Sequence, residues 1–126
     1  MSTGPIAYAR ADLAQAVSQV TDLPVLTHVP ERLAPPCVVI TEGTPLLTLD
    51  ETATGAVTVA LDLNVIAAPI TDNAQLIARM DEAVDRIVTG LWPEYAPTVD
   101  AYATITGPDT QPYLAAVIHT TTELTI

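Results

Sequence analysis

The stretch from residue 57 to residue 91 constrains the fold most, because the pattern of a β-strand passes directly into the pattern of an amphipathic helix. Over residues 57–67 every odd position is apolar, and the two-residue period of a strand places these side chains on one face. The even positions include Asp62 and Asn64, which a dry interior does not accept without polar partners. We therefore predict a strand with one core face and a second face that meets water or another subunit.

A helix is predicted directly after this strand. Pro69 removes a backbone donor and ends the strand, Asp72 is the expected N-cap, and Gln75 completes a capping box. Large apolar residues then recur at spacings of three and four up to Leu91, which gives one apolar stripe wide enough to cover a sheet. Gly90 is the expected C-cap, because glycine readily adopts the left-handed conformation that ends many helices.

The rest of the chain shows the same strand and helix periods in its apolar residues. Helical spacing extends over residues 5–20, and short strands are expected over 25–29 and 37–42. Longer strands over 98–106 and 113–126 are expected to pair as a terminal hairpin. The order α-β-β-β-α-β-β predicts an α+β fold, with an antiparallel or mixed β-sheet of about five strands and two helices packed on one face.

The segment 43–55 and the strand 98–106 allow more detailed predictions. In the segment 43–55, three leucines could extend the preceding strand into a hairpin arm, and the acidic tail is typical of an exposed tip. The leucines are Leu46, Leu47 and Leu49. In the strand 98–106, alternation places four residues inward: Val99, Ala101, Ala103 and Ile105.

Length and charge limit the classes of protein to consider. With 126 residues the chain is expected to form a single domain over residues 1–126. Its 15 acidic residues against 4 arginines, with no lysine, give a net charge of -11, which repels nucleic acid phosphates in general. This charge argues against a DNA-gripping protein, but it is compatible with a wall past which DNA slides without sticking.

Neither a membrane span nor a signal peptide is expected, because the chain has no apolar run of about 18 residues and no basic region leading into an apolar one. The single cysteine, Cys37, cannot form an internal disulfide, and its apolar neighbours favour a buried thiol.

No catalytic constellation is visible in the sequence. The five glycines are scattered singly, which excludes a dinucleotide fingerprint and a P-loop. His28 and His119 lie far apart and neither has another ligand at metal-binding spacing. Asp62 and Asp100 could form a carboxylate pair if their strands are neighbours, although solvated or interfacial acids are the simpler interpretation. We therefore expect no catalytic residue, no metal and no cofactor, and a protein that is not an enzyme.

Several segments together resemble the tail terminator (tail completion) proteins of long-tailed bacteriophages. They are the N-terminal helix and the segment after it (LAQAVSQVTDLPVLTHVPERLAPPCVVI), the acidic loop, the long strand VTVALDLNVIAAP, the helix TDNAQLIARMDEAVDRIV and the closing hairpin. The resemblance covers nearly the whole chain and lies in element order, length and overall character, without a diagnostic motif.

This resemblance implies a structural virion protein. Proteins of this family are α+β domains that form a hexameric ring on the end of the tail tube, stop its polymerisation and present the surface to which the head connector docks. The implied partners are further copies of the chain, the tail tube protein and the head-tail connector or head-closure protein, with DNA passing the channel without specific binding and no membrane involved. The implied location is the head-proximal end of the phage tail, after assembly in the host cytoplasm.

The same resemblance points to two groups of contact residues. The candidate channel or tube contacts are Glu42, Asp50, Glu51, Asp62 and Asn64. Trp92 and Tyr95 are candidate interface anchors, because aromatic residues concentrate at interfaces, and residues covering the core are the alternative interpretation. Like-charge repulsion between channel acids and phosphates would let DNA pass, and a closed ring would leave no free edge for the next tube subunit.

Three other functions remain open at this point. A head-closure or tail-tube subunit of the same virion is the nearest, and a tube subunit would polymerise by itself. A small-molecule binding module or enzyme would require a deep apolar pocket, which the sequence does not indicate. An accessory domain of a bacterial multiprotein complex would bind a host partner and form no ring.

Overall fold

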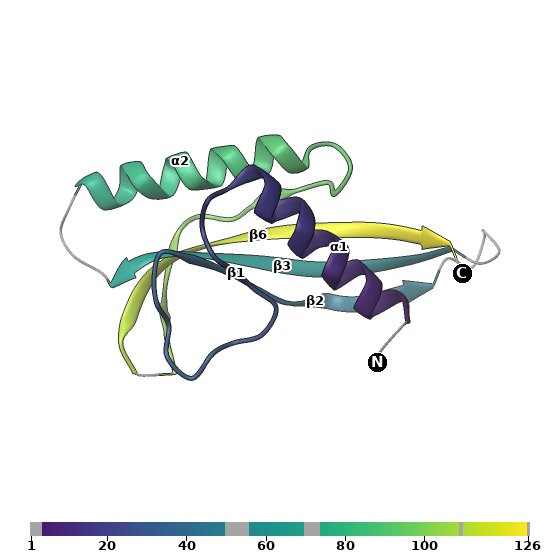
Figure 1. Ribbon diagram of the computed structural model, residues 1–126, viewed down its shortest axis with the longest axis horizontal. Helices are drawn as coiled ribbons and strands as arrows, with labels where there is room; N and C mark the ends of the chain where they lie inside the picture. Colours follow the sequence, from purple (N-terminus) through teal and green to yellow (C-terminus); the bar gives the residue numbers. More distant parts are fainter. Residues whose placement is uncertain (1–3, 50–55, 70–73, 109, 126) are drawn as a thin grey trace.

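The computed structural model describes residues 4–49, 56–69, 74–108 and 110–125. In chain order its elements are α1 (Pro5–Val20), β1 (Val25–Leu26), β2 (Cys37–Leu49), β3 (Ala56–Pro69), α2 (Ala74–Leu91), β4 (Thr98–Val99), β5 (Ala103–Thr106) and β6 (Pro112–Thr125). The predicted α+β class and element order are confirmed (Figure 1). No described helix is long and apolar enough to cross a membrane.

The sheet is mixed and is built around β3. Its strand order is β1-β2-β3-β6-β4, with β5 also paired to β6. Only β1 and β2 pair in parallel, and every other described pair is antiparallel. The long strands β2, β3 and β6 run along the longest axis of the molecule (Figure 1). The sheet has six strands instead of about five because the predicted strand 98–106 is divided into β4 and β5.

Both helices cover the same face of the sheet, as predicted. The core on this side combines the odd-numbered apolar residues of β3 with one stripe from each helix. Its members include Val59, Leu61, Leu63 and Val65 of β3, Leu13 and Val17 of α1, and Met80, Val84 and Ile87 of α2. Each large side chain buried here contributes about 1.5 to 3 kcal/mol before entropy is subtracted. This face is therefore the main core.

The two helices approach each other closely at Gly90. A Cβ built at this position would lie 2.5 Å from Cγ1 of Val20 at the end of α1. Gly90 lies inside α2, which continues to Leu91, so the predicted C-cap role is wrong. Glycine is present here because the helices leave no room for a side chain. The predicted N-cap, Asp72, lies outside the described residues.

A second, smaller core covers one end of the opposite face. Its buried members are Leu33, Cys37, Val39, Ile66, Tyr113 and Ala115. Leu33 comes from the connection between β1 and β2, which extends beyond the sheet on the side away from α2 (Figure 1). The expected strand 25–29 ends at Leu26, so this connection begins earlier than predicted. Cys37 is 1% exposed, which confirms the buried thiol.

The strand predicted over 98–106 changes phase in its middle. Val99 pairs with Ile118 on the helix-covered side, but Ile105 pairs with Tyr113 and packs into the smaller core on the opposite face. Residues 100–102 belong to neither strand, and Tyr102 packs against the main core. The prediction that Val99 and Ile105 share one inward face is therefore wrong, because the chain leaves the sheet between β4 and β5.

The expected hairpin arm after residue 42 is present as part of β2. The register with β3 shifts between Glu42 and Leu47, and pairing then continues to Leu49 opposite Val57. Gly43 is buried at this shift, and a Cβ there would lie 2.8 Å from the carbonyl oxygen of Ala60. The close approach of the two backbones explains why this position carries glycine.

Candidate functional site

Polar residues of β3 and β6 gather on the face away from the helices, beyond the smaller core. We call this group of residues the polar sheet face, and it comprises Thr58, Asp62, Asn64, His119, Thr121 and Glu123. The register places Asp62 opposite His119 and Thr58 opposite Glu123. This arrangement agrees with the predicted second face of residues 57–67.

His119 joins two carboxylates on this face. Its Nδ1 lies 2.8 Å from Oδ1 of Asp62, and its Nε2 lies 2.8 Å from Oδ2 of Asp100. A neutral imidazole has only one N–H and could donate to only one of these acceptors. The imidazolium carries a proton on each nitrogen and satisfies both carboxylates. The geometry therefore selects the charged form of His119.

The electrostatic surroundings of His119 favour the same form. The hydrogen bonds to Asp100 and then to Asp62 raise the pKa of His119 above its ordinary value of 6.5, while partial desolvation acts in the opposite direction. The side chain of Asp62 is 22% exposed and that of Asp100 is 74% exposed. The cluster thus has a sheltered end on β3 and a solvated end after β4.

Three neighbouring strands position this cluster. Asp62 lies near the middle of β3, and His119 is its register partner on β6. Thr98 of β4 pairs with His119 on the other side, and Asp100 follows β4 by one residue. Asp100, two residues after Thr98, reaches the same face, as its contact with Nε2 of His119 shows. The carboxylate pair considered from the sequence is therefore separated by a bridging histidine.

Asn64 serves the contact between β3 and β2. Its Nδ2 donates to the carbonyl oxygen of Val39 at 3.1 Å and to Oγ1 of Thr41 at 2.9 Å. The side chain is half-buried, as these hydrogen bonds permit. Asn64 thus lies on the polar sheet face, with its amide group hydrogen-bonded inside the chain.

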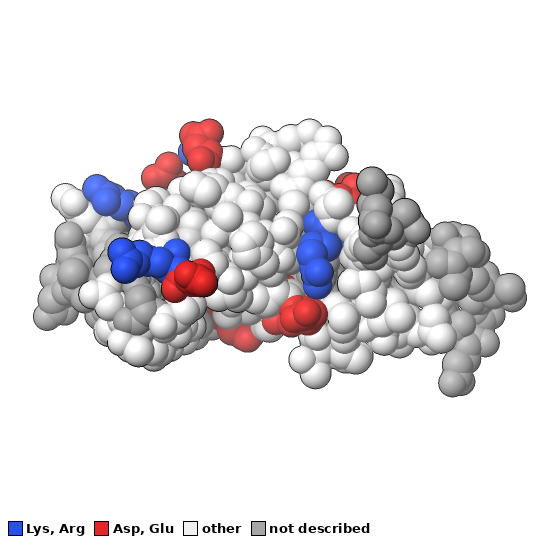
Figure 2. Space-filling view, turned by 60° about the horizontal axis from the view of Figure 1, so that its bottom comes forward, with Lys and Arg blue, Asp and Glu red and all other residues white. Residues whose placement is uncertain are grey.

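Glu42, the remaining described candidate for channel or tube contacts, is not brought to this face. Glu42 pairs in register with Leu61, whose side chain belongs to the main core, and lies 3.6 Å from Arg10 of α1. It therefore lies on the helix-covered side of the sheet. Asp50 and Glu51 lie outside the described residues. Figure 2 shows charged side chains in a few small groups on a largely uncharged surface.

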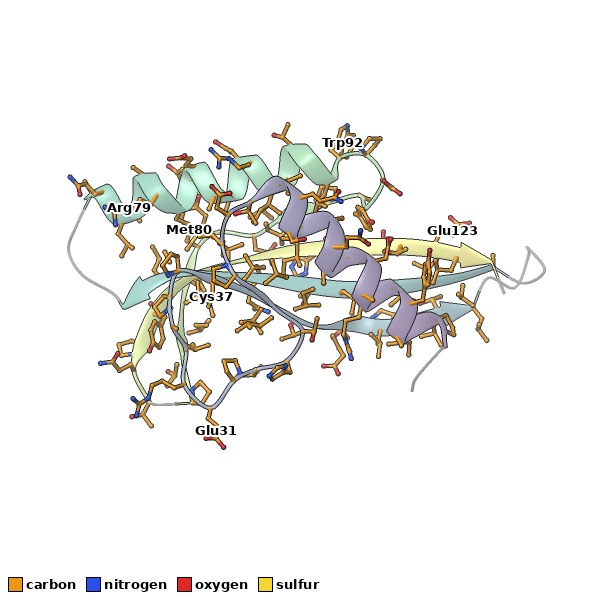
Figure 3. The ribbon with its side chains drawn as sticks, in the orientation of Figure 1. Glu31, Cys37, Arg79, Met80, Trp92 and Glu123 are labelled. Atoms are coloured by element: carbon orange, nitrogen blue, oxygen red, sulfur yellow. The ribbon has the colours of Figure 1, made fainter. Side chains whose placement is uncertain are left out.

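The two candidate interface anchors differ in exposure. Tyr95 is 5% exposed and packs in the main core, and its hydroxyl donates to Oδ2 of Asp12 on α1 at 2.5 Å. Burial and this hydrogen bond raise the pKa of Tyr95. Trp92 is 66% exposed and points away from the sheet at the end of α2 (Figure 3). Tyr95 is thus a core residue within the chain, while Trp92 offers an aromatic surface.

A cavity of about 270 Å³ lies between α2 and the end of β3. Its apolar lining includes Leu23, Val65 and Met80, and Arg79 and Arg86 lie at its polar margin. The volume is just below the range of about 300 to 1,000 Å³ that is usual for small-molecule sites. Among the described residues, no group of His, Cys, Asp or Glu could hold a metal ion.

The His119 cluster is suited to electrostatic positioning. Each ring nitrogen already faces a carboxylate, so no free nitrogen is directed at an incoming substrate. Cys37 is buried in the smaller core, and desolvation raises the pKa of its thiol, which disfavours the reactive thiolate. The cluster links β3, β6 and the segment that follows β4.

The sequence contained only part of the signal for this cluster. Alternation placed Asp62 on the polar face of its strand, but it could not pair this residue with His119. Asp62 and His119 are 57 residues apart, so their contact depends on the register between β3 and β6.

Comparison with known proteins does not add to the geometry, since no protein-family model and no curated protein matches the chain.

Proposed function

We propose that this chain is a tail terminator of a long-tailed bacteriophage, which closes into a ring on the end of the tail tube, ends its polymerisation and presents a docking surface for the head connector. The observation that carries the proposal is the polar sheet face, which long strands present and which neither helix covers. Its acids include Asp62 and Glu123, while the four arginines of the chain lie on α1, on α2 and before β2.

The charge distribution supports a surface that DNA passes without binding. No described strand contains arginine, and the chain contains no lysine. Phosphates near such a surface are repelled, and the repulsion falls off within a Debye length of about 8 Å at physiological salt. The exposed Trp92 supports a contact with a further subunit or partner, because tryptophan is enriched at interface centres.

The proposal is tested by the mass of the purified protein, measured by light scattering over a wide concentration range with negative-stain images of the same fractions. We expect a closed ring with a central hole, either alone or on added tail tubes. Open-ended tubes would assign the chain to the tail tube instead. A strict monomer that forms no ring on tail tubes would overturn the proposal.

A matched pair of variants tests the surface itself. Thr121→Arg places a large cation on the polar sheet face, and Gln19→Arg places the same group on an exposed position of α1. If the polar sheet face makes subunit or tube contacts, Thr121→Arg lowers the measured mass or abolishes capping, because a buried unpaired charge is costly. Gln19→Arg is expected to behave as wild type. Equal behaviour of the two variants would contradict the role of this face.

A further inference from the structure

Residues 100–102 are attached to the sheet by side chains. They lie between β4 and β5 and belong to neither strand. Asp100 reaches His119 on the polar sheet face, and the hydroxyl of Tyr102 donates to Oδ1 of Asp81 on α2. These two contacts fasten the segment on opposite faces of the sheet. The contact of Asp100 depends on protonation, because only an imidazolium donates to both carboxylates.

We propose that the doubly protonated His119 is a pH-dependent clasp, which holds residues 100–102 against β6 by bridging Asp100 to Asp62 of β3. When His119 loses a proton, one nitrogen becomes an acceptor that faces a carboxylate oxygen at 2.8 Å. Two acceptors at this distance repel each other, so one of the two contacts opens. The contact of Asp100 opens first, because Asp100 is solvated and lies outside a strand, whereas Asp62 is held within β3.

The groups around His119 decide the direction of the switch. On β3 the facing titratable group is Asp62, and from the residues after β4 it is Asp100. On β2, Thr41 is the register partner of Asp62 and carries no charge. Both facing groups are anions, so they stabilise the imidazolium. The clasp is therefore closed below the ordinary pKa of 6.5 and opens as the pH rises through the raised value.

This inference is independent of ring formation, because all three groups belong to one chain. The test is an NMR titration of the full-length protein, in which His28→Gln identifies the signals of His119. We expect His119 to titrate above 6.5, and we expect its pKa to fall in Asp100→Asn, which removes one of the two anions at an exposed position. Titration at or below 6.5, or an unchanged pKa in Asp100→Asn, would overturn the proposal.

The motion of the segment provides the second readout. Backbone ¹⁵N relaxation of residues 100–102 is expected to show greater mobility as the pH rises through the His119 titration, with β6 as the internal reference. In Asp100→Ala, which leaves Nε2 of His119 without this partner, the segment is expected to show this mobility at low pH as well. Relaxation of residues 100–102 that stays constant across the titration would show that His119 holds nothing, and would also overturn the proposal.

Discussion

Gly90 shows how one missing side chain brings two helices together. The residue lies in the last turn of α2, where the helix passes Val20 at the end of α1. A Cβ at Gly90 would lie 2.5 Å from Cγ1 and 2.9 Å from Cβ of Val20. Both contacts involve the side chain of one residue, so the constraint is local. Gly4 provides a contrast, because a Cβ there would meet no atom within 4 Å.

Gly90→Ala is therefore expected to destabilise the protein even though alanine favours a helix. The gain in helix propensity is about 1 kcal/mol, whereas overpacking costs about 1 to 3 kcal/mol, so we expect a net loss of up to about 2 kcal/mol in the free energy of unfolding. Urea denaturation measures this loss. Val20→Ala in the same chain removes the clash and is expected to recover part of the stability. If Gly90→Ala and Gly4→Ala have the same free energy of unfolding, the inferred close contact between the helices at Gly90 is contradicted.

At the scale of elements, two tyrosine hydroxyls connect the segment after α2 to the helices. Tyr95 donates to Asp12 on α1 from within the main core, and its carbonyl oxygen accepts a hydrogen bond from the backbone N–H of Thr121 on β6. Tyr102 donates to Asp81 on α2 in a more exposed position. Both contacts are hydrogen bonds from a tyrosine hydroxyl to an aspartate, one part-buried and one exposed, so comparing them shows the effect of burial.

Tyr95→Phe is expected to cost more stability than Tyr102→Phe. Loss of a part-buried hydrogen bond to a charged group costs about 1.5 to 3 kcal/mol, whereas an exposed one contributes at most about 1 kcal/mol. Denaturation of the two variants tests the order, and equal losses would contradict it.

The ionisation of the tyrosines is the corresponding pH prediction. Burial and the hydrogen bond to Asp81 raise the pKa of Tyr102 to about 12, from an ordinary value of 10.0. The stability that depends on the neutral hydroxyl is thus present below pH 10 and is lost as the pH rises from 10 toward 12. Ultraviolet titration of tyrosinate is expected to show a component with this raised pKa, which Tyr102→Phe removes. A titration curve that Tyr102→Phe leaves unchanged would contradict this assignment.

Elements that depend on local periods could be predicted from the sequence, whereas contacts that depend on register could not. The helical spacing over residues 5–20 matches the observed bounds of α1. Its apolar spacing and the following Leu23-Pro24 pair are both local signals. The phase change between β4 and β5 has no such signal, since it depends on residues 100–102 leaving the sheet. The bridge from Asp62 through His119 to Asp100 depends on this detour and on the β3–β6 register.

At the scale of the whole molecule, the excess of acidic residues predicts a net repulsion among the charges. The chain has a net charge of -11 and only 4 arginines, of which Arg10 and Arg86 form ion pairs with Glu42 and Glu82. The Arg86–Glu82 pair is exposed and Arg10 is half-buried beside an exposed Glu42, and surface pairs contribute about 0 to 1 kcal/mol each. Salt therefore screens more repulsion than attraction between charges. Added salt is thus expected to raise the free energy of unfolding.

We accordingly expect the urea midpoint at neutral pH to rise when salt is increased from about 10 mM to about 150 mM, because the Debye length falls from about 30 Å to about 8 Å. The gain should shrink as the pH approaches the isoelectric point near 4.1, where the net charge disappears. A midpoint that falls with salt at neutral pH would mean that the few ion pairs outweigh the repulsion among 15 acids.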